Sequence, residues 1–189
     1  MSTVQTFERK YPWTEKIGIH RLTFRLMTPA DEQSMQSAVL KFANNLADSD
    51  LVFLRMDITQ PEVVHEWINN IRMGRTSTIL VEEEGKVVGY GNLHYSPLQW
   101  TSHIGEIRVL VENTLRGSGV GRILVNELTQ LARSKGLEKI VAHIPSTQPR
   151  VRHMFEGLGF EPSALLTDWL KDRNYKTHDL IIMARELEG

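Results

Sequence analysis

EIRVLVENTLRGSGVGR, residues 106–122, is the stretch on which the fold depends most. Its first six residues are rich in β-branched and apolar side chains, which is typical of a strand. Arg116 and three glycines at alternate positions follow, and an apolar stripe then runs from Val120 towards Lys135 at intervals of three and four residues. The pattern predicts a strand, a short turn, a glycine loop and a helix in direct succession.

The glycine loop has the chemistry of an anion-binding site. A loop that runs into a helix presents unpaired backbone N–H groups and the positive end of the helix dipole, and both suit a phosphate or pyrophosphate. Gly117, Gly119 and Gly121 would let such a group approach the backbone closely. Turns also collect glycine for conformational reasons alone, so the loop by itself leaves both interpretations open.

Two nucleotide-binding patterns do not fit this loop. The dinucleotide pattern G-x-G-x-x-G requires a different third spacing, and no strand follows at the right distance with an acidic residue for a ribose hydroxyl. The phosphate loop G-x-x-x-x-G-K-[ST] is also excluded, because no Gly-Lys-Ser or Gly-Lys-Thr follows. The pattern that fits is an arginine followed by x-x-G-x-G, over Arg116–Gly121, between a strand and a helix.

The sequence on both sides predicts one α/β domain on a largely antiparallel sheet. Residues 1–18 lack clear periodicity and are predicted to be an N-terminal arm, and residues 19–189 form the domain. Helices are predicted after the N-cap and proline at Thr28-Pro29, from Pro61, and after the glycine loop. Strands are predicted at Ile19–Met27, Ser77–Glu83, Lys86–Tyr95, Ile104–Val111, Lys139–Ile144, Ala164–Leu170 and His178–Leu187.

Composition narrows the class of protein. The chain has 189 residues, 41% of them hydrophobic, which suits one globular domain with a sizeable core. A formal net charge of -1 gives no overall field that would attract nucleic acid or a membrane, so we expect neither partner. Cysteine is absent, which excludes a cysteine nucleophile and favours a cytoplasmic location. The histidines lack metal-ligand spacing, so we expect no metal.

At Arg116–Gly121 the sequence resembles the GNAT superfamily of N-acetyltransferases, whose cofactor motif is Gln or Arg followed by x-x-G-x-G or x-x-G-x-A. The resemblance extends from roughly Ile19 to Leu187 and includes Glu156–Phe160 (EGLGF), which is similar to the family's E-K-L-G-F segment. It implies a central mixed, mostly antiparallel sheet of about seven strands with flanking helices. It also implies a cofactor cleft where the motif strand splays from its neighbour, with acetyl-CoA as co-substrate.

The resemblance implies which residues meet the cofactor. The backbone near the end of the motif strand would contact the pantetheine arm and the thioester, with the N–H of Leu110 donating to the oxyanion of the tetrahedral intermediate. The amides of the glycine loop would hold the pyrophosphate, and Gln148 stands where relatives often have an asparagine that binds the pantetheine arm. The expected cofactor-binding residues are Val109, Leu110, Val111, Arg116, Gly117, Ser118, Gly119, Val120, Gly121, Arg122 and Gln148.

Two residues are candidates for catalysis. An amine acceptor with a pKa near ~10 is mostly protonated at neutral pH, so a base must remove a proton before the amine attacks. Glu106 lies where many relatives carry a catalytic glutamate, and His143 lies where some hold a glutamate near the acceptor. The alternatives are a solvent-facing carboxylate and a histidine hydrogen-bonded under the sheet. Phe155 stands where many relatives have a tyrosine that protonates the CoA thiolate, and a phenyl ring cannot donate that proton.

The expected function is transfer of an acetyl group from acetyl-CoA to the primary amine of a small molecule, such as an amino acid or a polyamine. One alternative is a protein or peptide N-acetyltransferase. The other is a non-catalytic acyl-CoA-binding sensor, for which Phe155 is the motivating feature. Exposed edges of the sheet would also allow a homodimer.

Overall fold

The computed structural model describes residues 9–52, 54, 56–98 and 100–187. These residues form one eight-stranded sheet in the order β1-β2-β3-β4-β5-β6-β8-β7. Every neighbouring pair is antiparallel except β5 and β6, which run parallel. The strands are β1 (Trp13–Ile17), β2 (His20–Leu26), β3 (Thr76–Glu83), β4 (Lys86–Tyr95), β5 (Ile104–Val111), β6 (Lys139–Pro145), β7 (Glu161–Lys171) and β8 (Thr177–Glu186).

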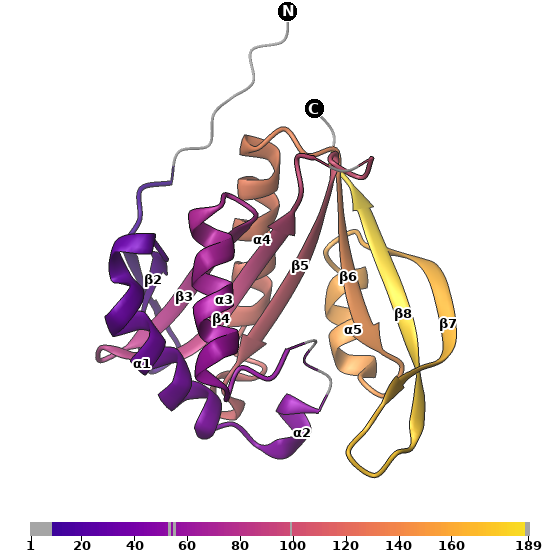
Figure 1. Cartoon of the computed structure of the whole chain (residues 1–189), viewed down its shortest axis with the longest axis horizontal. Helices are drawn as coiled ribbons and strands as arrows, with labels where there is room; N and C mark the ends of the chain where they lie inside the picture. Colours follow the sequence, from indigo (N-terminus) through magenta and orange to yellow (C-terminus); the bar gives the residue numbers. More distant parts are fainter. Residues whose placement is uncertain (1–8, 53, 55, 99, 188–189) are drawn as a thin grey trace, which may run out of the picture.

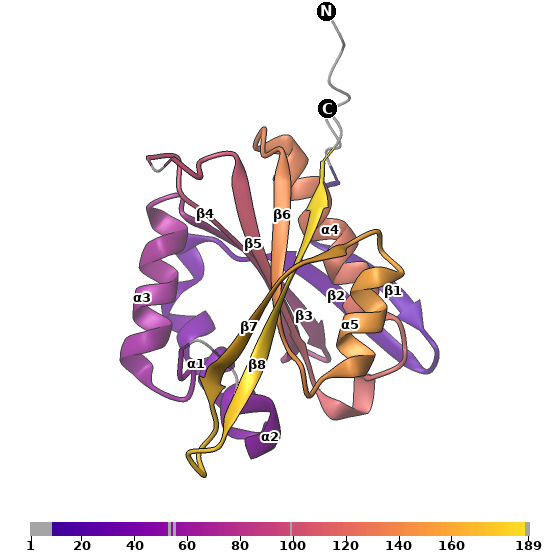
Figure 2. The same cartoon turned by 90° about the vertical axis from the view of Figure 1, so that its right-hand side faces the viewer.

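Helices cover both faces of the sheet (Figure 2), so the domain has three layers. The α-helices of the described part are α1 (Glu32–Asn44), α2 (Asp48–Leu51), α3 (Pro61–Arg72), α4 (Val120–Ser134) and α5 (Pro149–Glu156). One face carries α1 and α3, and the opposite face carries α4 and α5. None of the described helices is long and apolar enough to span a membrane.

Alternation along the central strands divides the buried side chains between two cores. On β3, Ile79 and Val81 pack in the core beneath α4, whereas Leu80 packs in the core beneath α1 and α3. This is the period of two expected for a strand that is covered on both faces. The α4 side approaches β4 closely, because a Cβ added at Gly91 would lie 3.0 Å from a methyl carbon of Leu128. The sheet is therefore held firmly from both sides.

The parallel pairing of β5 with β6 is short. Ile104, Gly105 and Glu106 pair with Lys139–Val141, and the register contains no pair beyond Glu106. From that point the two strands diverge towards the end of the molecule that is lowest in Figure 1. The resemblance predicted this splay, and the structure has it.

Most predicted elements are present, with β4 and β5 at their predicted bounds. The sheet has eight strands, where about seven were predicted, because part of the N-terminal arm forms β1 and pairs with β2. The division expected after residue 18 therefore falls within a hairpin. Pro29–Asp31 forms a 3-10 turn ahead of α1, and the short helix α2 was not predicted.

A polar contact between distant parts of the sequence attaches the N-terminal strand to α4. The hydroxyl of Tyr11 donates to Oε2 of Glu127 at 2.6 Å, and Arg9 forms an ion pair with Oε1 of the same carboxylate at 3.1 Å. Glu127 is buried, so its charge needs these partners. The ring of Trp13 stacks on Phe24 with the centroids 4.1 Å apart. These contacts hold β1 at the edge of the sheet.

Replacing Tyr11 with phenylalanine should lower the free energy of unfolding by about 1 kcal/mol, because a buried carboxylate loses a hydrogen bond while the ring is kept. Urea unfolding of wild type and variant at neutral pH measures this difference. Tyr175→Phe is the matched control, since Tyr175 is 82% exposed. Equal stability of all three proteins would show that the Tyr11 contact does not contribute.

Candidate functional site

The gap between β5 and β6 is lined on the β5 side by backbone groups. The N–H of Glu112 donates to the carbonyl of Val88 at 2.9 Å, which fixes the phase of the β4–β5 ladder. With the regular register that pairs Leu110 with Tyr90, the N–H and C=O of even-numbered β5 residues point to β4. Those of Val109 and Val111 point to the gap. Beyond Glu106, they face no partner strand among the described residues.

This hydrogen-bonding pattern between β4 and β5 contradicts the role expected for the Leu110 N–H. The N–H of Leu110 was expected to stabilise an oxyanion, but the register directs it into the ladder with β4. Its carbonyl oxygen points the same way, since it lies 2.9 Å from the position of a Cβ added at Gly89. The Leu110 side chain packs against the core under α1 and α3. Val109 and Val111 are the residues of this segment whose backbone groups face the cleft.

The glycine loop lies at the end of β5 and leads directly into α4. Gly117 and Gly119 have φ of 77° and 98°, and the space around both Cβ positions is open to 4 Å. Gly119 is the N-cap of α4, whose first turn contains no acidic residue. The hydroxyl of Ser118 donates to the carbonyl of Leu115 at 2.6 Å. The loop therefore presents the first N–H groups of α4 without an acidic side chain in the helix's first turn.

Gly121, in the first turn of α4, lies next to α5. A Cβ at this position would lie 3.4 Å from the sulfur of Met154, which is an ordinary van der Waals contact. Arg122, the next residue, donates to the carbonyl of Gly157 at 3.3 Å, just beyond the end of α5. Gln148 is the N-cap of α5 and follows β6. The predicted cofactor residues therefore occur on both rims of the cleft, at the ends of β5 and of β6.

Arg116 connects the loop to the other side of the molecule. Its guanidinium lies 2.5 Å from Oδ1 of Asp50 on α2, and the Asp50 side chain is only 6% exposed. The chain after α2 contributes Leu54, Met56 and Ile58 to the cavity described below. The ion pair therefore connects the glycine loop to α2, the helix that precedes these cavity-lining residues.

The structure brings the two predicted catalytic residues together. Glu106 is the last β5 residue paired with β6, and its Oε1 lies 3.6 Å from Nδ1 of His143. The same oxygen accepts hydrogen bonds from Nε and Nη2 of Arg108, the former at 2.8 Å. Glu106 is mostly buried and His143 is one-third exposed. The carboxylate therefore occupies the apex of the cleft.

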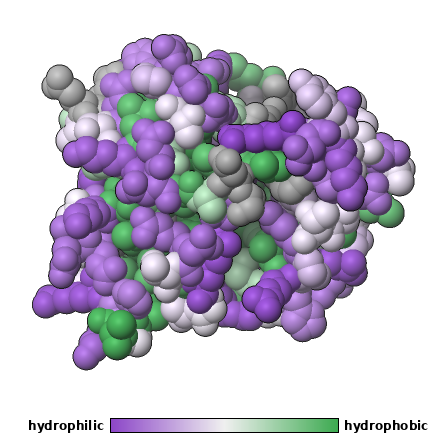
Figure 3. Space-filling model, turned by 90° about the horizontal axis from the view of Figure 1, so that it is seen from below, coloured by the Kyte–Doolittle hydropathy of each residue, from purple (hydrophilic) through white to green (hydrophobic). Residues whose placement is uncertain are grey.

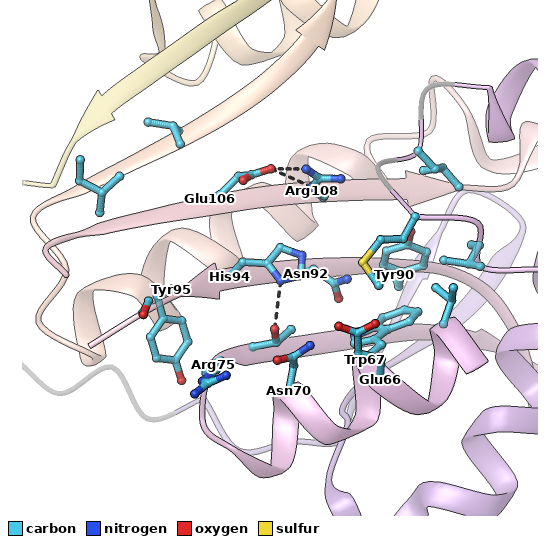
Figure 4. A pocket seen from close by; sticks show the side chains of 18 of the residues that line it. Glu66, Trp67, Asn70, Arg75, Tyr90, Asn92, His94, Tyr95, Glu106 and Arg108 are labelled. Atoms are coloured by element: carbon cyan, nitrogen blue, oxygen red, sulfur yellow. Dashed lines mark hydrogen bonds and ion pairs between the residues drawn. The ribbon is translucent and has the colours of Figure 1, made fainter. Parts of the chain in front are cut away.

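A cavity of about 520 Å³ reaches this carboxylate from the α3 side of the sheet (Figure 4). Glu106 and Arg108 line it from β5, and His94 lines it from β4. His143 is outside the lining. The cavity-lining residues that the sequence analysis did not select include Glu66, Trp67, Asn70, Arg75, Tyr90 and Asn92. Only the pairing of distant strands brings them together, so no local pattern marks them.

Hydrogen bonds between side chains fix the floor of the cavity. The indole N–H of Trp67 donates to Oγ1 of Thr78 at 2.8 Å, and that hydroxyl donates to Oδ1 of Asn92 at 2.7 Å. All three residues are buried. Two residues earlier on β3, Oγ1 of Thr76 lies 3.0 Å from Nδ1 of His94. Buried polar groups with partners of this kind hold side chains in single orientations.

Phe155 does not enter the cleft. Its side chain is buried in the core beneath α4, and its ring makes an edge-to-face contact with Phe160 at a centroid separation of 4.9 Å. The phenyl ring thus contributes to packing.

Figure 3 shows the end of the molecule towards which β5 and β6 diverge. Apolar side chains are visible there between polar ones.

Raising the pH above about 10 should reduce stability partly through Tyr90, which lines the cavity. Burial disfavours the phenolate and raises the pKa of Tyr90 to about 12. The unfolded chain then loses the proton first, so this contribution is intact below pH ~10 and is lost as the pH rises towards the folded value. Urea unfolding of wild type and Tyr90→Phe at a series of alkaline pH values should show a shallower decline in the variant. Parallel declines would contradict the assignment.

Comparisons with known proteins agree on the type of domain. The model of the acetyltransferase (GNAT) family matches residues 41–160. YwnH of Bacillus subtilis, named as a proposed phosphinothricin acetyltransferase, is 25% identical over 173 residues, covering 88% of this chain and 99% of that protein.

Solved structures share the fold. The ribosomal-protein-alanine N-acetyltransferase of Brucella melitensis has 25% identity and a TM-score of 0.70, covering 87% of this chain and 99% of that one. The spermidine N-acetyltransferase of Vibrio cholerae, solved with CoA and spermine, has 19% identity and a TM-score of 0.69, covering 88% and 95%.

Proposed function

Because this chain belongs to the GNAT family of acetyltransferases, we propose that it transfers the acetyl group of acetyl-CoA to the primary amine of a small molecule. The observation that carries the proposal is the position of Glu106. This residue lies at the apex of the cleft between β5 and β6 and also lines the cavity under α3. A thioester in the cleft and an amine in the cavity would meet at this carboxylate.

The cleft suits an extended acyl-CoA. The unpaired edge of β5 offers the backbone groups of Val109 and Val111 to a pantetheine arm, which would bind almost as an added strand. The pyrophosphate would then reach the glycine loop and the N-terminus of α4, where the N–H groups and helix dipole favour an anion. Val109 is nearer than Val111 to Glu106, so we assign the oxyanion-stabilising N–H to Val109.

The acetyl transfer does not require a side chain that protonates the departing CoA sulfur. The amine nitrogen attacks the thioester carbonyl, the C–S bond breaks and CoA leaves as a thiolate. A thiol with a reference pKa of ~8.5 is a fair leaving group without assistance, which is consistent with the burial of Phe155. Glu106 lies near both reactants, and His143 adds a second titratable group at 3.6 Å.

The charges of the cavity favour an acceptor that carries an anion as well as an amine. Glu66 and Arg75 line it, and neither forms an ion pair with any residue that the structure describes. A carboxylate could pair with the guanidinium of Arg75 while the ammonium group approaches Glu106. An amino acid or its analogue fits this pattern better than a polyamine. The name of YwnH, a proposed phosphinothricin acetyltransferase, agrees with this choice.

The proposal is tested by free-thiol release from acetyl-CoA with a panel of amino acids, polyamines and short peptides. The absence of cysteine means that the protein adds no thiol background. Wild type should release CoA with an amino acid or a close analogue, and Glu106→Gln should lower kcat at least about tenfold. Release only with peptides would favour the protein-acetyltransferase alternative. Acetyl-CoA binding without release for any acceptor would favour the sensor.

Adding a methyl group at Gly117 should weaken acetyl-CoA binding at least about tenfold, because the Cβ would occupy space next to the loop amides. Gly136→Ala is a matched control: Gly136 has φ of 71° against 77° at Gly117, and both positions are open. Both variants should lose about 1 kcal/mol of stability through backbone strain. Titration calorimetry should show the loss of affinity in Gly117→Ala alone. Equal affinities would exclude a pyrophosphate site at the loop.

A further inference from the structure

We infer that His94 is the base that takes the first proton from the acceptor ammonium group. This inference rests on the proposed acetyltransferase function and assigns a role within it. His94 was not among the predicted catalytic residues, because it lies on β4, outside the motif strand. Its position across the ladder from Glu106 carries the inference.

His94 and Glu106 form a directly opposed pair in the β4–β5 register. Opposed residues in an antiparallel pair project on the same face of the sheet, with their Cβ atoms about 5 Å apart. Both side chains line the cavity under α3 (Figure 4). An amine that enters this cavity and reaches Glu106 therefore also reaches the imidazole of His94.

The Thr76 hydroxyl positions the ring for this role. Oγ1 of Thr76 lies 3.0 Å from Nδ1 of His94, and Thr76 is buried at the start of β3. With Nδ1–H donating to this hydroxyl, the basic atom of the neutral ring is Nε2, on the opposite side of the imidazole. The contact holds the orientation of the ring, and we take the tautomer in which Nδ1 carries the hydrogen.

The alternatives are less well placed to be the first base. Oε1 of Glu106 already accepts two guanidinium N–H groups from Arg108, so the carboxylate is suited to holding the ammonium group by its charge. His143 lies near Glu106 but does not line the cavity. A neutral imidazole carries one unprotonated ring nitrogen, which can accept a proton from an ammonium group.

One ammonium proton passes to Nε2 of His94, and the amine lone pair then forms the C–N bond with the thioester carbonyl carbon. The C–S bond breaks and its electron pair leaves with sulfur. The second nitrogen proton neutralises the CoA thiolate, while His94 returns its proton to water. One ammonium group and one thioester thus give one amide, one thiol and one proton.

The test is the pH profile of kcat/KM for His94→Gln, measured with the acceptor that wild type uses best. Glutamine retains a polar side chain but cannot act as a base near neutral pH. At pH ~7 the variant should be at least about tenfold slower, with its affinity for acetyl-CoA unchanged. The deficit should shrink to within about threefold near pH 9.5, where more of the amine is already unprotonated.

The groups that face His94 must be constant across this comparison. Among the described residues that line the cavity with His94, the charged or titratable ones are Glu106 and Arg108 from β5, Tyr90 and Tyr95 from β4, Glu66 from α3, and Arg75 just before β3. All of them are present in both proteins, so the ratio of the two profiles reports on the imidazole. Thr76→Val should show a smaller deficit with the same pH trend, because it removes only the positioning contact. His153→Gln, whose side chain is 90% exposed on α5, should behave as wild type.

Either of two results would overturn the inference. A His94→Gln variant that keeps more than half of the wild-type kcat/KM at pH ~7 would remove His94 from the reaction. A deficit of the same size at all pH values would assign it a purely structural role. Failure of wild type to release thiol with any acceptor would instead count against the proposed function, so the two failures are distinguishable.

Discussion

The short parallel pairing of β5 with β6 is the constraint on which the rest of the site depends. Three residues of each strand pair, and the strands separate after Glu106. If the pairing continued, the backbone groups of Val109 and Val111 would be used in the sheet. Because it stops, the same strand holds the sheet together through its β4 edge and leaves the other edge for a ligand.

Close packing on the α4 side supports that geometry. A Cβ at Gly105 would lie 2.7 Å from a methyl carbon of Leu93 and 2.8 Å from one of Leu137, so a larger residue at this point of the parallel pairing would force both leucine side chains to move. Just beyond it, the cavity floor is fixed by the hydrogen bonds from Trp67 to Thr78 and from Thr78 to Asn92. The two faces of one sheet therefore perform different tasks: one fixes where the strands part, and the other shapes the space next to that point.

The local parts of this arrangement could be predicted from the sequence, and the long-range parts could not. The strand Ile104–Val111 and the loop before Val120 follow from periodicity and glycine spacing, which are properties of adjacent residues. The phase of the β4–β5 ladder depends on a pairing between distant segments, and the expected role of the Leu110 N–H was wrong for that reason. His94 became visible as a neighbour of Glu106 only once the register was known. The strand β1 was missed although it pairs with the adjacent β2, because the side chains at its three central positions are exposed and no apolar alternation marks it.

The most direct test of the central claim is a crystal structure of the protein with acetyl-CoA. We expect the pantetheine arm to lie along the free edge of β5, with the thioester oxygen about 2.9 Å from the N–H nitrogen of Val109 and the acetyl group facing Glu106. The pyrophosphate should contact the amides of the loop that ends at Gly119. A cofactor bound outside the gap between β5 and β6, or an acetyl group pointing away from the cavity under α3, would contradict the account.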